Sequence, residues 1–167
     1  PYCASKDGIV YSNDFTEIIY VPQAVEGKIT IHDNITELGH HFYGKEKITE
    51  IVLPAKLTEI TDSAFYGCFA LSNVTIPQSV SVINAYAFFD CDSLTSVSIP
   101  DGVTVIPEGC FANCDSLNNV TLGKNVKTIE NDAFNNCQSL EDINLPDGLE
   151  SIGNYAFHST FSLLNID

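Results

Sequence analysis

The stretches AFYGCFALSNVTIP, at residues 64–77, and AFFDCDSLTSVSIP, at residues 87–100, hold the same residues at the same places. Alanine, phenylalanine, cysteine, leucine, valine, isoleucine and proline recur, while the residues between them change. The second copy begins 23 residues after the first. A chain that repeats its apolar residues at one fixed step is typical of a repeat protein.

The same step of 23 residues continues to the end of the sequence. Five columns of apolar residues keep the register over all or nearly all of the copies, and so many columns exclude chance. They are Ile60, Ile83, Ile106, Ile129 and Ile152; Phe65, Phe88, Phe111, Phe134 and Phe157; Cys68, Cys91, Cys114 and Cys137, with Thr160 in the fifth place; Leu71, Leu94, Leu117, Leu140 and Leu163; and Val74, Val97, Val120, Ile143 and Ile166.

Each unit reads L-x-x-V-x-I-P-x-x-V-x-x-I-x-x-x-A-F-x-x-C-x-x. The alternation around Val74 predicts a short strand with one buried face, which the following proline ends. Residues 80–83 predict a second short extended piece. A short helical turn is then expected, with Asn84 as its cap and, in the next unit, Pro107 at its first position.

A unit of this size has too few apolar side chains to fold alone, and neighbouring units must cover both of its faces. The sequence therefore predicts an α/β solenoid of leucine-rich-repeat type, with stacked 23-residue units, short parallel strands and short helical turns.

The pattern weakens towards the N-terminus. Ile29, Ile31, Ile35 and Leu38 form a shorter unit that is one residue out of step. Before it, residues 8–22 predict a β-hairpin around an Asn13-Asp14 turn, which is a suitable lid for the first unit. We expect a hairpin cap over residues 1–28 and one solenoid domain over residues 29–167. Because Asp167 falls inside a strand, we expect the solenoid to continue beyond it.

The charge balance limits the kinds of partner. The chain has 22 acidic residues against 7 basic ones, a net charge of −15. A nucleic acid would need a basic footprint, so we expect no nucleic-acid partner. No run of 18 apolar residues occurs, and we expect no direct membrane insertion by this segment.

Neither enzymatic chemistry nor a bound cofactor or metal is predicted. The cysteine column reads as small buried apolar groups, too widely spaced along the stack for disulfides. His32, His40, His41 and His158 form no metal-binding motif. Asp90, Asp92 and Asp115 read as solvated turn residues, with weak calcium contact as the alternative.

The first candidate site is the outer face of the predicted strands. Because Leu71, Val74 and Ile76 point inward, the residues between them point outward. The outward positions form columns of small polar side chains, which suit hydrogen bonding to a protein or glycan; the alternative is a merely solvated face. They are Asn73, Thr75, Ser96, Ser98, Asn119, Thr121, Asp142 and Asn144.

The second candidate site is aromatic. Tyr66, Phe69 and Phe89 gather in two adjacent units, with Tyr86 nearby. Later units hold small or polar residues at these places, so the core does not demand rings there. Exposed apolar clusters often mark contacts, and the alternative is packing against the irregular first unit.

The columns L-x-x-V-x-I-P and A-F-x-x-C resemble the BspA-like leucine-rich-repeat family over residues 29–167. The segment DGIVYSNDFTEIIYVP, residues 7–22, is also similar to the hairpin that often precedes such repeats. Cys110 for alanine, Gly123 for proline and Thr160 for cysteine depart from the pattern. The resemblance implies a secreted or cell-surface protein, mostly bacterial, whose role is adhesion to a host protein, matrix or other cell. A passive spacer in a larger surface protein is the alternative.

Overall fold

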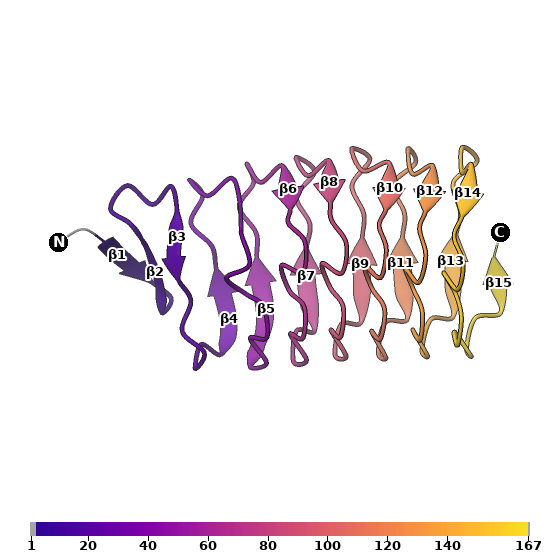
Figure 1. Cartoon of the computed structure of the whole chain (residues 1–167), viewed down its shortest axis with the longest axis horizontal. Coiled ribbons are helices and arrows are strands. Elements are labelled where there is room, and N and C mark those ends of the chain that lie inside the picture. The colour runs from indigo at the N-terminus through magenta and orange to yellow at the C-terminus, as the bar shows by residue number, and fades with distance from the viewer. Residues whose placement is uncertain (1–2, 167) are drawn as a thin grey trace.

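The computed structural model describes residues 3–166, with side chains for residues 4–164. In this part of the chain there are fifteen strands and no helix, and the coils stack along one axis into an elongated rod (Figure 1). The strands are β1 Cys3–Lys6, β2 Ile9–Ser12, β3 Ile18–Tyr20, β4 Gly27–Thr30, β5 Ile48–Val52, β6 Glu59–Ile60, β7 Asn73–Thr75, β8 Val82–Ile83, β9 Ser96–Ser98, β10 Val105–Ile106, β11 Asn119–Thr121, β12 Thr128–Ile129, β13 Asp142–Asn144, β14 Ser151–Ile152 and β15 Asn165–Ile166.

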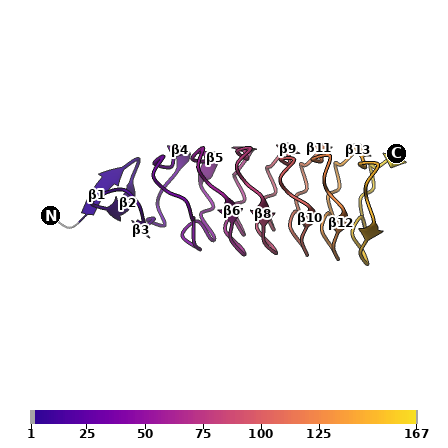
Figure 2. The ribbon, with the colours of Figure 1, turned by 90° about the horizontal axis from the view of Figure 1, so that it is seen from above.

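The coils carry two rows of parallel strands on opposite sides (Figure 2). The first row contains β4, β5, β7, β9, β11, β13 and β15, and the second contains β6, β8, β10, β12 and β14. The register keeps the repeat of the sequence: Val120 lies opposite Val97 on one side and Ile143 on the other. The predicted solenoid of stacked units is therefore confirmed.

A small antiparallel sheet covers the N-terminal end. β2 and β3 pair as the hairpin predicts, and β1, which sequence reasoning missed, adds a third strand. The connecting turn is tightly bonded, because the Asp14 carboxylate accepts hydrogen bonds from Ser12 Oγ, Thr16 N and Thr16 Oγ1. These bonds lower the pKa of Asp14 to about 2. The division into a cap at residues 1–28 and a solenoid at residues 29–167 stays a prediction, and β4 spans that boundary.

The first coil is one residue shorter than the others. Ile29 pairs with Ile51, 22 positions later, after a register shift between Gly27 and Lys28. The later coils keep the step of 23, as in the pairing of Ile51 with Val74. The first coil thus stays one residue short along β4, beyond the bulge.

The core is a stack of aligned apolar columns. Six phenylalanine rings follow one another along the axis, with neighbouring centroids 5.2 to 5.6 Å apart: Phe42, Phe65, Phe88, Phe111, Phe134 and Phe157. The first five are fully buried, and Phe157, in the last coil, is only partly covered. Each ring therefore depends on the next coil for part of its burial.

The predicted helical turns are wrong. The segment around Ala87 and Phe88 is bounded by left-handed residues, Tyr86 at φ 56° and Asp90 at φ 57°. Its amides do not all point back along the chain, as they do in an α-helix. The amides of Tyr86, Phe88 and Asp90 donate to carbonyls of the following coil. Asn84 is likewise no helix cap, since its Nδ2 donates to Glu59 Oε1 and to the carbonyl of Ile60.

The cysteine column does more than fill space. Each buried thiol donates to the carbonyl of a phenylalanine in the preceding coil at 3.1 to 3.3 Å, in the pairs Cys68–Phe42, Cys91–Phe65, Cys114–Phe88 and Cys137–Phe111. Burial raises the pKa of the Cys68 and Cys137 thiols to about 12. These four thiols and Cys110 are free and buried, and the side chain of Cys3 lies outside the described residues.

Both strand rows lose their hydrogen-bonded pairing at one level, between β7 and β9 and between β8 and β10. In the second row Pro107 removes one of the ladder bonds. The amides of Asn84, Glu130 and Gly153 at equivalent places each donate to the preceding coil, and proline has no amide to donate. The turn ladder and the phenylalanine stack continue across this level and hold the two halves together.

Candidate functional site

The first candidate surface lies on the first strand row. We call it the polar strand face and define it by Asn73, Thr75, Ser96, Ser98, Asn119, Thr121, Asp142 and Asn144, all of which are exposed. Asn119 lies in register with Ser96 and Asp142, and Thr121 with Ser98 and Asn144. The residues between them, Val97, Val120 and Ile143, are buried. The structure thus brings together in two straight columns the polar side chains that the sequence singled out.

The polar strand face is hollowed where the pairing between β7 and β9 is open. A hollow of about 310 Å³ is lined there by side chains of β7, β9 and β11, with Gln78 at its margin. Amides and hydroxyls supply both donors and acceptors around it. This arrangement can hydrogen-bond a neutral polar ligand or a peptide backbone.

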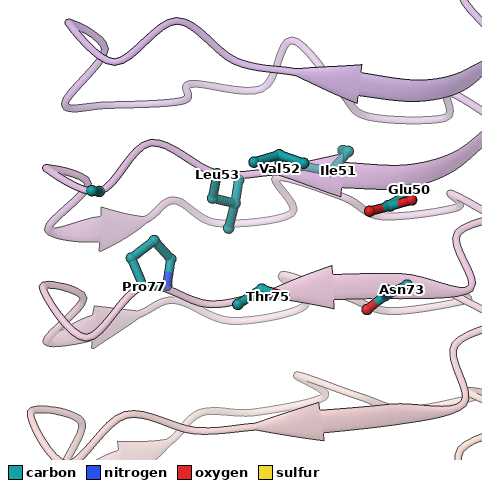
Figure 3. A pocket seen from close by; sticks show the side chains of 8 residues that line it. Glu50, Ile51, Val52, Leu53, Asn73, Thr75 and Pro77 are labelled. Atoms are coloured by element: carbon teal, nitrogen blue, oxygen red, sulfur yellow. The ribbon is translucent and has the colours of Figure 1, made fainter.

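A second hollow, of about 210 Å³, adjoins the first at Asn73 and Thr75 (Figure 3). Sequence reasoning missed it. We call it the apolar hollow; its apolar lining comes from Ile51, Val52, Leu53, Ala55 and Pro77, and its polar lining from Glu50, Asn73 and Thr75. The Glu50 carboxylate is paired with Lys28 Nζ at 2.8 Å. A hollow of this size and lining has room for one aliphatic side chain.

Two residues that line the apolar hollow differ from the residues at the equivalent places of the other coils, and this difference is the sequence signal for the hollow. Val52, with 37% of its surface exposed, stands where other coils have Thr75, Ser98 and Thr121. Ala55 stands where later coils have longer polar or charged residues, Gln78, Asp101, Lys124 and Asp147. The coil geometry requires neither change, and both residues line the same hollow.

The second candidate surface lies beside the buried phenylalanine stack. Tyr66 and Phe89 stack with centroids 4.7 Å apart, and Tyr86 packs edge-on to Phe89 at 5.9 Å. Tyr43, which sequence reasoning did not include, stacks on Tyr66 at 5.0 Å. We call these four residues the aromatic ladder. Phe69 is 40% exposed but pairs with none of these rings, so the structure separates it from the cluster.

Tyr86 is rigidly held. Its ring lies over Gly109 of the next coil, where a Cβ atom would come within 2.5 Å of the ring carbons. Its hydroxyl donates to Glu108 Oε1. This bond, then partial burial and the charges of Glu108, Asp132 and Asp62, raise the pKa of Tyr86 to about 12.

Among the described residues no three His, Cys, Asp or Glu side chains are placed to hold a metal ion. His41, Glu17 and Glu37 do line a hollow of about 440 Å³ between the cap and the first coil. However, no hydrogen bond in the described part of the chain joins His41 to either carboxylate, as a base held by an orienting acid would require.

The stacked coils and their two strand rows define a leucine-rich-repeat solenoid. Residues 36–164 match the model of the BspA type leucine rich repeat region in six copies, and the chain belongs to this family. A search of curated proteins finds no match.

Two solved structures resemble the whole chain. A leucine-rich-repeat protein from Bacteroides ovatus is 30% identical with a TM-score of 0.81, and the match covers 100% of this chain and 44% of that protein. A leucine rich cell surface protein from Faecalibacterium prausnitzii is 27% identical with a TM-score of 0.78, covering 99% of this chain and 54% of that one. The chain therefore spans about half the length of these relatives.

Residues 3–166 contain no helix that is long and apolar enough to cross a membrane.

Proposed function

We propose that this chain is a non-enzymatic interaction module of a secreted or cell-surface protein, and that the polar strand face is its main binding surface. The aligned columns of exposed polar side chains carry the proposal, together with the two hollows that meet at Asn73 and Thr75. The partner is a protein or a glycan, and the role is adhesion to a host protein, matrix or other cell. Surface localisation is supported by the cell-surface relative from Faecalibacterium prausnitzii.

The geometry favours a polymer partner over a small metabolite. The polar groups extend over β7, β9, β11 and β13, whereas each hollow holds only a small part of a ligand. An extended partner can place one aliphatic group in the apolar hollow and hydrogen-bond along the columns. Such a surface gains affinity from many small contacts on a rigid frame.

The test is binding of the purified chain to a panel of matrix proteins and to a glycan array. The blocking variant is Ser98→Arg/Thr121→Arg, which places two long side chains on the polar strand face. The matched control is Ser81→Arg/Thr104→Arg, which makes the same charge change at exposed positions beside the second strand row.

We expect at least one partner to bind the wild type and the control alike and to bind the blocking variant at least tenfold more weakly. All three proteins should melt at similar temperatures. Capture of no partner by the wild type would contradict the proposal and leave the passive spacer. Equal loss in both variants would move the site away from the polar strand face.

A further inference from the structure

The aromatic ladder has properties that the polar strand face does not explain. Its side chains come from the turns that connect the strand rows. Tyr43, Tyr66 and Phe89 each follow a buried phenylalanine by one residue, and Tyr86 precedes Phe88 by two. Tyr43 is 52% exposed. In the column of Tyr66 and Phe89 the next coils have Ala112, Asn135 and His158. The fold therefore tolerates small and polar residues here, and the rings are an addition to it.

The ladder is held in place before any partner arrives. Tyr66 is stacked between Tyr43 and Phe89, with both ring pairs within 13° of parallel. Tyr86 is fixed by Gly109 and by its hydrogen bond to Glu108. Ordered rings lose little conformational entropy on binding, which favours a contact role.

Acidic side chains dominate the sequence around Tyr66, Tyr86 and Phe89. From residue 57 to residue 123 the sequence has seven acidic residues and no lysine, arginine or histidine. Burial raises the pKa of the Tyr66 phenol, and the Asp90 carboxylate raises it further. The hydrogen bond to Glu108 raises the pKa of Tyr86 most, followed by burial and by the charges of Glu108, Asp132 and Asp62.

Neutral groups bond these carboxylates within the described residues. Asp62 accepts from Ser63 Oγ, Asp90 from Asn113 Nδ2 and Glu108 from the Tyr86 hydroxyl. Lys45, the lysine nearest to Tyr43 in the sequence, is buried, and its Nζ donates to Gln23 Oε1 at 3.0 Å. The negative charge beside the rings is thus left for a partner to compensate.

We propose that the aromatic ladder binds a lysine- or arginine-rich segment of a partner protein. The long aliphatic stems of such side chains lie against ring surface, and their charged ends reach the carboxylates of Asp62, Asp90 and Glu108. The exposed ring of Tyr43 adds a cation–π attraction. This inference rests on the proposed interaction role but uses a different surface, so the two fail separately.

The probes are fluorescein-labelled nona-lysine and nona-arginine peptides, with nona-glutamate as the negative probe. Binding is followed by fluorescence anisotropy in 150 mM sodium chloride. A net charge of −15 attracts any basic peptide, so the variants must separate local recognition from total charge.

The first variant, Tyr66→Ser/Phe89→Ser, removes ring surface without a change in charge. The second, Asp62→Asn/Asp90→Asn/Glu108→Gln, removes three local charges and keeps all rings. Its matched control is Glu26→Gln/Asp33→Asn/Glu37→Gln, which removes three exposed charges in and near the cap. Ser98→Arg/Thr121→Arg, the blocking variant of the polar strand face, tests whether the two surfaces are separate.

We expect each ladder variant to weaken binding of at least one basic probe by fivefold or more. The matched control variant should weaken binding of the same probe by less than twofold. The polar-face variant should stay within threefold of the wild type. The proposal is overturned if the control loses as much affinity as the local charge variant, because total charge then explains binding. It is also overturned if removal of the rings has no effect in a folded protein. If the ring variant fails to fold, the comparison of the two charge variants decides.

Discussion

The Cys91 thiol donates a hydrogen bond to the backbone carbonyl of Phe65, in the preceding coil, across 3.3 Å. The same contact recurs from Cys68 to Phe42, from Cys114 to Phe88 and from Cys137 to Phe111. A side chain of every coil except the first and the last thus bonds a buried carbonyl of its neighbour. The Phe65 carbonyl also accepts from the Cys68 amide at 3.1 Å, so the thiol adds a second, inter-coil bond to it. The cysteine column is therefore a structural joint between coils.

Replacement of Cys91 by alanine should remove the hydrogen bond between the two coils. Loss of the hydrogen bond and the small cavity should lower the free energy of unfolding by about 1–3 kcal/mol. Urea denaturation measures the change, with Ser96→Ala on the exposed strand face as the control. A loss below about 0.5 kcal/mol would mean that the thiol contributes only volume.

The stability of the protein should fall in mild alkali. Burial raises the pKa of Cys68 and Cys137 to about 12 and that of Cys91, Cys110 and Cys114 well above its ordinary value of 9.0. Above about pH 9 the unfolded chain releases these thiol protons while the folded chain keeps them. Stability is thus fully present below that pH and decreases as the pH rises.

The slope of that decrease approaches about 1.4 kcal/mol per pH unit for each fully titrating thiol. Cys110→Ala offers the matched variant, because the other coils have Ala64, Ala87, Ala133 and Ala156 in this column. Denaturation between pH 8 and 9.5 should give a shallower slope for the variant than for the wild type. Equal slopes would show that this thiol does not contribute.

Gly109 is expected to tolerate no side chain. Its φ is +58°, and a Cβ would come within 2.5 Å of the Tyr86 ring. Gly109→Ala should lower the free energy of unfolding by about 1–3 kcal/mol. Gly148→Ala is the control, because no atom lies within 4 Å of the added Cβ, and it should leave the free energy of unfolding unchanged or raise it slightly. Gly109→Ala should cost less stability in a Tyr86→Ala background than in the wild type, because the ring that obstructs the added Cβ is then absent. Strict additivity of the two changes would argue that the ring is not the obstacle.

The sequence predicts the solenoid because the repeat is written in buried residues. The step of Phe65, Phe88 and Phe111 translates directly into a stack of rings. The sequence does not predict the conformation of the turns, because an Ala-Phe segment after a capping residue is compatible with one turn of helix as well as with the non-helical turn observed. The missed signal is the column Gly67, Asp90, Asn113, Asn136, in which glycine, asparagine and aspartate are the residues that best adopt a left-handed conformation.

The candidate surfaces were predictable to different degrees. Strand alternation places Asn73 and Thr75 outward without further information, because a strand has a period of two. The apolar hollow depends on the shape left by Val52 and Ala55 between two coils, which no single column reveals. Tyr43 was missed as a member of the aromatic ladder because the first coil is one residue out of step and its column is hard to align.

The apolar hollow can be tested separately from stability. Val52→Thr restores the polar type found at Thr75 and Thr121 in the same column, and an exposed strand position should tolerate it within about 0.5 kcal/mol. We expect it to weaken binding of the partner identified on the polar strand face by at least threefold, measured by surface plasmon resonance. Val82→Thr, at an exposed place on the second strand row, is the control. Equal effects of the two variants would exclude the hollow.

The most direct test of the proposed binding surface is side-chain protection by hydroxyl-radical footprinting of the complex with its partner. Val52 reports on the first strand row, while Val82 and Val105, which are 44% and 37% exposed, report on the second. We predict that bound partner slows oxidation of Val52 at least threefold and leaves Val82 and Val105 unchanged. Protection of Val82 and Val105 with Val52 still reactive would contradict it.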